Sequence, residues 1–339
     1  MSLSAFTSRY LSALEAEMQA VVSASAPTVR DLYGYLRYHL GWVDDRFRPH
    51  RGRTGKRLRP ILCLLSCEAC GGDWEQALPA AAAVELLHNF SLIHDDIEDR
   101  DDVRRGRPTV WALWGVPQAI NAGDALFVLA HLAMLRLSGR GVSAETVAEA
   151  LRVFDRACLR LTEGQFMDIR FEEKEEVGLE EYLAMIEGKT GALISAACEL
   201  GALVAGAPAD QRDRLRAFGR HLGLAFQIQD DVLGIWGDPE KTGKPVGSDL
   251  RSRKKTLPIL HGLQHDPALR ALLARPTLGE EEVGEAIRRL EAVGSRAFAE
   301  EQARRHIDQA LAVLEAADLQ SPAASALHDL TFGMVERAR

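Results

Sequence analysis

The stretch LPAAAAVELLHNFSLI, residues 78–93, is apolar on nearly every face of a helix, and HDDIED, residues 94–99, follows it at once. A helix that is hydrophobic nearly all round belongs in the centre of a large bundle. Apolar residues recur at spacings of three and four along most of the chain, whereas alternating runs typical of strands are almost absent. The sequence therefore predicts an all-α fold, a large helical bundle around a deep central cavity.

The helical periodicity is interrupted where glycine and proline occur, and these positions separate the expected helices. The periodic segments are residues 3–22, 31–47, 56–70, 75–99, 117–138, 143–172, 179–205, 210–235, 279–316 and 321–337. None of the breaks is long enough to be a clear interdomain linker. We therefore expect a single domain over residues 1–339, with a weak boundary at 264–279 before two C-terminal helices.

The composition excludes several classes of protein. The chain has 339 residues, is 47% hydrophobic and carries a net charge of −8, so a general nucleic-acid-binding surface is not expected. Five cysteines, an odd number, argue against a disulfide framework and for a reducing compartment. No uninterrupted apolar run reaches roughly 18 residues, and the N-terminus does not resemble a signal peptide. We expect a soluble, cytoplasmic protein without a membrane span.

Acidic side chains gather where the apolar stretch 78–93 ends. Asp95 and Asp99 are one helical turn apart on the same face, roughly 6 Å along the axis, and Asp96 lies between them. A solvated helix end is the simplest explanation, but acids that directly follow a buried helix favour a binding role. Carboxylates without cysteine favour Mg²⁺ or a similar hard cation, normally shared with a substrate phosphate.

A second acid pair, Asp230 and Asp231, follows the apolar run LGLAFQIQ, residues 222–229. Either pair alone would be weak support for a metal site, because acid pairs are common on protein surfaces. Two such pairs at the polar ends of two buried helices predict one shared site for several metal ions and a diphosphate.

Basic residues are clustered near both acid pairs. The run RFRPHRGRTGKRLR, residues 46–59, has seven Lys or Arg and no acid, and we expect Lys56 and Arg59 to share one face at a helix start. Arg104 and Arg105 follow the first acid pair. Basic residues also follow the second pair, namely Lys244, Arg251, Arg253, Lys254 and Lys255. Each run alone is more often solvated surface, but the repeated order of acids and then bases favours diphosphate binding.

Seven short motifs follow one another along the chain. They are GKRLRP (55–60), HNFSLIHDDIEDRDDVRRGRPT (88–109), NAGDALF (121–127), EGQFMD (163–168), GKTGAL (188–193), FQIQDD (226–231) and GKPVGSDLRSRKKTLP (243–258). With this order and spacing the chain resembles the trans-isoprenyl diphosphate synthases of the polyprenyl synthetase family. The resemblance covers about residues 50 to 260, which is most of the core.

The resemblance implies an isoprenoid synthase fold, usually a homodimer, and a prenyltransferase that condenses an allylic diphosphate with isopentenyl diphosphate using more than one Mg²⁺ ion. It implies that isopentenyl diphosphate is held by Lys56, Arg59, His88 and Arg105, and the allylic diphosphate by Arg104. It implies magnesium ligands at Asp95, Asp99 and Asp230, with supporting carboxylates at Asp96 and Asp231. It implies that the allylic diphosphate and the developing cation are lined by Lys189, Thr190, Gln227, Lys244 and Lys254.

The length of the product is read from the residues that precede the first acid pair. Phe90 and Ser91 lie five and four residues before Asp95, and the acid motif has no insertion. In the family this combination resembles geranylgeranyl diphosphate synthases, so a twenty-carbon product is expected, with Phe90 as the floor for the growing chain. Phe90 could equally be ordinary core packing, and a farnesyl or longer product is the alternative.

Two departures from the family pattern concern the second acid pair. The usual third acid is Gly234, with Asp238 one turn further on, and the glycine before the last family lysine is Arg253. Gly234 motivates a non-catalytic regulatory subunit as an alternative function. A class I terpene cyclase is a further alternative, but it would have no use for Lys56 and Arg59, and no Asn-x-x-x-Ser-x-x-x-Glu motif is found.

Overall fold

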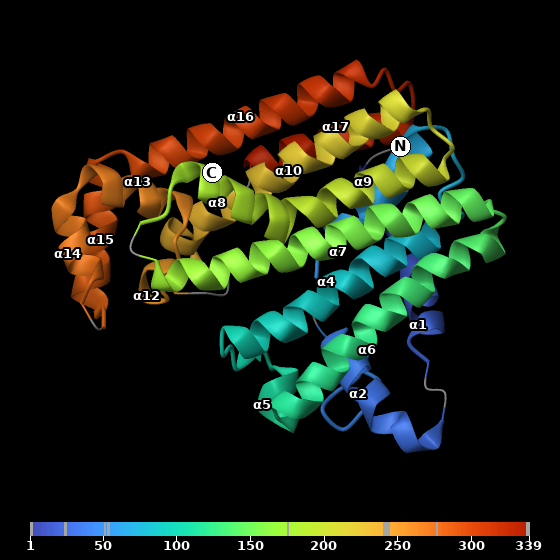
Figure 1. Ribbon diagram of the computed structural model, residues 1–339, viewed down its shortest axis with the longest axis horizontal. Helices are drawn as coiled ribbons and strands as arrows, with labels where there is room; N and C mark the ends of the chain where they lie inside the picture. The colour runs from blue at the N-terminus through green and yellow to red at the C-terminus, as the bar shows by residue number, and fades with distance from the viewer. Residues whose placement is uncertain are drawn as a thin grey trace. The chain divides into compact units, whose positions relative to one another are not determined.

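A computed structural model describes residues 3–23, 26–50, 52, 55–174, 176–239, 245–275 and 277–336 (Figure 1). Apart from one short hairpin, the regular structure of these residues is helical. The predicted all-α fold is therefore confirmed. Lys244, one of the expected diphosphate-binding residues, lies outside the described residues.

The chain divides into two compact units. Unit 1 contains Met1–Asp155, Ala196–Asp213 and Leu319–Leu327, and unit 2 contains Arg156–Ser195, Arg214–Asp318 and His328–Arg339. The chain passes repeatedly from one unit to the other, within α7 (Ala144–Glu173) and again within α10 (Ala209–Trp236). The single domain expected from the sequence stays a prediction.

Unit 1 is built around α4. Its helices are α1 (Leu3–Val21), α2 (Arg30–His39), α3 (Leu58–Ala69), α4 (Leu78–Glu98), α5 (Val110–Trp114) and α6 (Val116–Leu135). α4 packs along α6 and also contacts α1 and α3 (Figure 1). Every residue of α4 from 78 to 87 is buried, so the apolar stretch is a core helix, as predicted. Because the N-terminal half of α4 is held in this core, the acids at its C-terminal end lie at the opposite end of the helix.

A small hairpin follows α4. Its strands, β1 (Val103–Arg104) and β2 (Arg107–Pro108), pair antiparallel, and the two residues between them, Arg105 and Gly106, have φ of 55° and 77°. Positive φ at both central residues is what a tight type I′ hairpin turn requires. The sequence analysis did not predict this hairpin, because strands of two residues carry no alternating pattern. It presents Arg104 and Arg105 on a fixed turn.

Unit 2 holds the second acid pair. Its further helices are α8 (Leu179–Ile186), α12 (Ser248–Arg251), α13 (Leu257–His265), α14 (Pro267–Leu273), α15 (Glu280–Ala292) and α16 (Ser295–Ala316). The apolar faces of α8, α10, α13 and α16 form one core, in which Tyr182, Ile228 and Leu257 are buried. A second core joins Ile235 near the end of α10 to Leu250 of α12.

Several expected helices have different bounds. The helix expected at 31–47 ends at His39, and the one at 179–205 is divided by a wider π turn, Glu187–Gly191, before α9 (Ala192–Val204). The segment 279–316 is two helices, because Gly294 adopts a left-handed φ of 74° between them. The C-terminal helix α17, Pro322–Glu336, agrees with the prediction.

The stretch Val116–Arg140, which comprises α6 and one following 3-10 turn, is long and apolar enough to cross a membrane by length and composition alone. The core helix of a soluble protein passes the same test, and α6 packs along α4 with 44% of its most apolar window buried. The expectation that the chain has no membrane span stays a prediction.

Candidate active site

The acids at the end of α4 divide into accessible and buried side chains. Asp95 and Asp99 are partly exposed, and the Asp99 amide donates to the Asp95 carbonyl at 2.8 Å, so they stand one turn apart on the last turn of the helix. Asp96, between them, is only 1% exposed. The accessible pair can therefore bind a ligand, whereas Asp96 faces the protein.

Asp96 is neutralised by the hairpin. The Arg104 guanidinium donates from Nε to Asp96 Oδ1. Burial raises the pKa of Asp96 to about 6, against the opposing effect of the Arg104 charge. Its second oxygen, Oδ2, is buried without a hydrogen-bond partner among the described residues. The buried acid at the end of α4 is thus paired with Arg104, the residue that was predicted to hold the allylic diphosphate.

Beside Asp96, unit 1 has a small hollow that is partly open to solvent. Its lining is mostly basic and polar, comprising Tyr38, His39, Asp96, Arg104, Arg105, Arg107, Pro108, Thr109 and Val110. Arg59 and His88 belong to the same cluster, because the Arg59 guanidinium lies 3.4 Å from His88 Nε2 and the charges of Arg104 and Arg105 act on His88. Three of the four residues predicted to bind isopentenyl diphosphate are therefore brought together.

The cluster is strongly electropositive. Burial and the neighbouring arginines lower the pKa of His39 and of His88 well below 6.5, so both rings are neutral at pH 7. Burial also lowers the pKa of Arg59 and of Arg105. Guanidinium groups held this close in a buried pocket are stabilised by an anion that accepts their hydrogen bonds.

Buried atoms of this cluster lack partners. Arg59 Nε, Arg105 Nη1, His39 Nε2 and Thr109 Oγ1 are inaccessible to solvent and have no hydrogen-bond partner among the described residues. An unsatisfied buried polar group costs about 1–3 kcal/mol, so several in one place indicate that the site is completed by a ligand. The donors suit the oxygens of a phosphate group.

The fourth predicted residue is placed differently. α3 begins at Leu58, so Lys56 precedes the helix, is exposed, and does not share a helical face with Arg59. The expectation of one common face was wrong, because Arg57 adopts a left-handed φ of 50° directly before the helix. This non-helical conformation lies between the two basic side chains, so Lys56 is not part of the helix that carries Arg59.

Arg57 is a buried residue near the basic cluster, and it is held by hydrogen bonds to two glutamates. It is 3% exposed and donates to Glu85 at 2.6 Å and to Glu15 at 3.0 Å, while the Asn89 amide donates to Glu85 at 2.9 Å. The sequence analysis missed this network and His39. Glu85 offered a signal, because it is the one charged residue within the apolar run 78–87, and a buried charge requires a partner.

In unit 2 the second acid pair shows the same division. Asp230 is exposed and Asp231 is 4% exposed. Asp231 accepts hydrogen bonds from the Tyr182 hydroxyl at 2.5 Å, the Gln227 amide at 3.0 Å and the Leu257 backbone amide at 3.1 Å. Burial raises the pKa of Asp231 to about 7, against the opposing effect of these donors.

The π turn of unit 2 carries two further predicted residues. The Thr190 hydroxyl donates to Gln227 Oε1 at 2.7 Å, so Thr190, Gln227 and Asp231 form one hydrogen-bonded chain. Lys189 Nζ pairs with Asp168 of α7. Gly164 permits this approach, because a Cβ there would overlap the Lys189 backbone. Lys254 follows α12, where its amide donates to the Asp249 carbonyl at 3.0 Å.

The sequence profile of the polyprenyl synthetase family matches residues 42–290, most of the chain. The chain belongs to the polyprenyl synthetase family. It is 46% identical over 310 residues to a (2E,6E)-farnesyl diphosphate synthase of Mycobacterium bovis, covering 89% of this chain and 85% of the relative. It is 50% identical over 227 residues to a geranylgeranyl diphosphate synthase of Mycobacterium tuberculosis, covering 67% and 63%.

Solved structures agree with this assignment. The fold matches a polyprenyl synthetase of Streptomyces coelicolor A3(2) with a TM-score of 0.91 and 38% identity, over 98% of this chain and 100% of the other. The chain is therefore a trans-isoprenyl diphosphate synthase by family, with the isoprenoid synthase fold that the resemblance implied.

The residues of this synthase fit magnesium. The accessible acids, Asp95 and Asp99 in unit 1 and Asp230 in unit 2, offer only carboxylate oxygens, which are the donors that Mg²⁺ prefers. The buried acids, Asp96 and Asp231, are already engaged by protein donors. The assignment of these residues as metal ligands and supporting carboxylates, and the expectation of one shared site, stay predictions.

The two residues expected to set product length lie on α4. The Phe90 ring packs against Phe127 of α6 at 5.2 Å between centroids and against His94 at 4.8 Å, and Phe90 is partly buried. Ser91 is buried and donates to the His88 carbonyl at 2.9 Å. A partly buried ring fits either a floor or a packing role.

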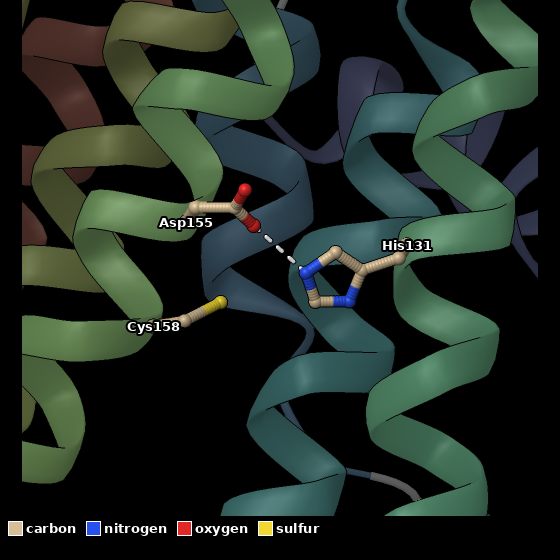
Figure 2. Close-up of side chains that lie close together, drawn as sticks. All are labelled: His131, Asp155 and Cys158. Atoms are coloured by element: carbon tan, nitrogen blue, oxygen red, sulfur yellow. Dashed lines mark hydrogen bonds and ion pairs between the residues drawn. The ribbon is translucent and has the colours of Figure 1, made fainter.

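The row of rings continues along α6. His131 contacts the Phe127 ring at 4.6 Å, and Figure 2 shows its Nε2 atom directed at Asp155, with 2.8 Å between Nε2 and Oδ1. The other ring nitrogen, Nδ1, lies 2.9 Å from the Phe127 carbonyl. Cys158, also drawn in Figure 2, follows Asp155 by three residues on α7. His131 is thus held in one orientation behind Phe127.

Proposed function

We propose that this synthase condenses isopentenyl diphosphate with allylic diphosphates to give a short-chain product, geranylgeranyl diphosphate. The observation that supports it best is the cluster of buried, unpartnered donors of Arg59, Arg105, His39 and Thr109 beside an acidic helix end. Donors of this kind fit a diphosphate, and accessible carboxylates fit the Mg²⁺ ions that accompany it.

The residues then take the following roles. Isopentenyl diphosphate is held by Lys56, Arg59, His88 and Arg105. The allylic diphosphate is held by Arg104, Lys189, Lys244 and Lys254. Asp95, Asp99 and Asp230 would hold Mg²⁺, which would supply positive charge to the departing diphosphate. Asp96 and Asp231 support these sites from the buried side.

The chain's own groups act on the cation that ionisation leaves. Gln227 presents an amide oxygen that already accepts from Thr190, and its amide nitrogen is held by Asp231, so the oxygen is oriented before reaction. Ammonium and guanidinium groups stabilise the leaving diphosphate more than the bound substrate. The proton lost after attack by the isopentenyl double bond passes to the released diphosphate, so no side-chain base is required.

Purified protein alone, incubated with isopentenyl diphosphate, allylic primers of five, ten and fifteen carbons and MgCl₂, tests the proposal. We expect elongated diphosphates whose formation stops when EDTA is added. Absence of any elongated product would instead favour the regulatory-subunit alternative, and release of a hydrocarbon would favour a cyclase.

The twenty-carbon length is proposed from the Phe90 position and the short acid motif. A farnesyl product is the alternative, since one similar relative is a farnesyl diphosphate synthase. Phe90→Ala is expected to shift the product distribution to longer chains, because it removes the ring that contacts Phe127. Product sizing by mass spectrometry gives the answer, with Phe166→Ala, an exposed ring on α7, as the control. Unchanged lengths would contradict the floor role.

We also propose that the synthase is a cytoplasmic homodimer. α6 exposes a row of apolar side chains, Val116, Ile120, Val128, Leu132 and Leu135. An apolar row of this kind on one helix suits a second copy of the chain. Leu132→Arg is expected to shift the mass in solution from dimer to monomer, as measured by light scattering during gel filtration.

A further inference from the structure

A histidine, an aspartate and a cysteine that have no part in the proposed function lie together on α6 and α7. His131 of α6 has its Nε2 atom 2.8 Å from Asp155 Oδ1, and Cys158 follows Asp155 by three residues on α7 (Figure 2). The imidazole nitrogen, the carboxylate oxygen and the sulfur all lie within 4.8 Å of one another. Three kinds of metal ligand are therefore gathered in one place.

The helices themselves fix this arrangement. Residues three apart on a helix share a face, so α7 presents the Asp155 carboxylate and the Cys158 thiol side by side. The His131 ring is held by two others, with 4.6 Å between its centroid and that of Phe127 and 5.1 Å to that of Phe154. Sites built on helices hold their ligands more precisely than sites built on loops.

The second ring nitrogen of His131 decides what Nε2 can meet. Nδ1 lies 2.9 Å from the Phe127 carbonyl oxygen, which can only accept, so Nδ1 carries the proton of the neutral ring. Nε2 then presents a lone pair to the Asp155 carboxylate, and two acceptors at 2.8 Å repel each other unless a cation joins them. Histidines that bind metal typically donate their other ring N–H to a group such as a backbone carbonyl. The pair therefore requires a metal ion or a second proton.

The thiol favours the metal ion over the proton. A proton shared by His131 and Asp155 would give an ion pair that does not involve Cys158, which is 9% exposed. Imidazole together with thiolate sulfur suits Zn²⁺ and similar cations, whereas Mg²⁺ prefers oxygen donors alone. The side chains of His131 and Asp155 are 27% and 60% exposed, so an ion can enter from solvent and a water molecule can complete a four-coordinate shell.

We propose that His131, Asp155 and Cys158 bind a borderline divalent cation such as Zn²⁺, at a site separate from the Mg²⁺ sites proposed for the diphosphates. Nε2, a carboxylate oxygen and the sulfur each form a bond to the ion, and the thiol proton passes to solvent. The three side chains adjust by small rotations, because ligand atoms around Zn²⁺ stand roughly 3.3 Å apart. The bound ion joins α6 to α7 behind Phe127.

Cobalt binding tests the assignment, because a thiolate bonded to Co²⁺ absorbs in the near ultraviolet and an oxygen site does not. The full chain, reduced and with excess MgCl₂ to fill the acidic sites, is titrated with CoCl₂ and then with ZnCl₂. We expect a band that saturates at one Co²⁺ per chain and is abolished by Zn²⁺, which such ligands bind more tightly. Cys158→Ser is expected to lose the band, whereas Cys70→Ser, a partly exposed cysteine at the end of α3, keeps it.

The exposed position of Asp155 allows a variant that does not disturb the core. Asp155→Cys supplies a second thiolate and is expected to strengthen the band. Loss of an outer partner of a metal ligand typically weakens binding 10- to 100-fold, so His131→Gln, which loses a ligand itself, is expected to weaken Co²⁺ binding by at least about tenfold. His221→Gln, which alters the other close histidine pair, His221 and His306, is the control and is expected to bind Co²⁺ normally.

The outcomes are clear in each case. A wild type that shows no band, or a Cys158→Ser variant that retains it, would overturn the assignment and leave His131 and Asp155 as an ion pair. A band of unchanged strength in Asp155→Cys would remove the aspartate from the site and would overturn the assignment as well. None of these results depends on turnover, so the elongation assay judges the proposed function separately.

Discussion

α4 and α10 each carry a pair of adjacent aspartates toward their C-terminal ends, and the two pairs lie in different surroundings. In both pairs the first acid is accessible and the second is buried. Asp96 is paired with a cation, Arg104, whereas the donors to Asp231 in the described part of the chain are the neutral groups of Tyr182, Gln227 and Leu257. One sequence motif can thus be stabilised by a charge in one unit and by hydrogen bonds in the other.

The difference has consequences for how each end responds to change. A charged partner couples Asp96 to the residues that bind substrate, because Arg104 lines the basic hollow. Neutral donors leave Asp231 as part of the core of unit 2, where Tyr182 is fully buried. We expect substitutions at the first end to affect binding and stability together, and those at the second end to affect stability and magnesium use.

The largest effect is expected where the two ends are alike, at the accessible acids. Asp95→Asn and Asp230→Asn are each expected to lower kcat by about 10³-fold, the loss seen when a group that stabilises transition-state charge is removed. The unfolding midpoint should change little, because both side chains reach solvent. Steady-state kinetics with Asp101→Asn, an exposed acid after α4, as the control would check this. Normal activity in either variant would contradict the assignment of that acid.

The next largest effect is expected at the first acid pair alone, where Asp96 depends on a charged partner. Arg104→Gln leaves a buried carboxylate without its cation and is expected to cost about 3 kcal/mol in the free energy of unfolding. Arg100→Gln, an exposed arginine in the same loop, should stay within about 0.5 kcal/mol. Urea unfolding without ligands measures both. Equal stability of the two variants would mean that Asp96 does not depend on its cation.

Tyr182→Phe is the corresponding change at the second end. It removes one of three neutral donors to Asp231 and is expected to cost about 1–2 kcal/mol, the range for a lost buried hydrogen bond. The pKa of Asp231 should rise further, so the loss is expected to be smallest at low pH, where the carboxyl is protonated in the wild type as well. A loss as large as that of Arg104→Gln would remove the contrast between the ends.

The smallest effect concerns pH. α10 packs on α16 through His221 and His306, whose Nδ1 atoms are 3.2 Å apart. Burial, with the neighbouring His306 and Arg220, lowers the pKa of His221 to about 4. Between pH 6.5 and 4 the unfolded chain binds a proton that the folded chain does not, so stability falls as pH falls through this window and is fully present above it.

After a discount for partial exposure, the loss between pH 7 and 5 is expected to be about 1 kcal/mol. His221→Gln should flatten this part of the stability curve, while His50→Gln, an exposed histidine of unit 1, should leave it unchanged. The same slope in wild type and His221→Gln would assign the pH dependence to other groups.

The fold and the position of the acids could be predicted because they depend on local pattern. The apolar run 78–93 had to be a core helix, and the acids that follow it had to emerge at its end. Which acid of each pair is buried could not be predicted, since this depends on partners that are distant in sequence. Arg104 meets Asp96 through a hairpin that has almost no sequence pattern, and Tyr182 reaches Asp231 from another helix.

The remaining differences have the same origin. From the sequence, Gly234 suggested a lost acid. The structure shows that a Cβ at this position would overlap the Asp249 carboxylate, and this depends on how a loop folds back onto α10, which the sequence pattern does not reveal. His39 carried no signal in the sequence, although its ring lines the basic hollow. Lys56 was expected on a helix that begins two residues later, since the left-handed conformation of Arg57 was not foreseen.

The central claim is that the accessible acids bind metal and the buried acids do not. It is tested most directly by diffraction from crystals grown with MnCl₂, isopentenyl diphosphate and a non-ionisable thio analogue of an allylic diphosphate. Anomalous peaks are expected about 2.0–2.6 Å from the carboxylates of Asp95, Asp99 and Asp230, with Arg59, His88 and Arg105 around a diphosphate. A peak on Asp96 or Asp231, or bound analogue with no metal at the accessible acids, would contradict the account.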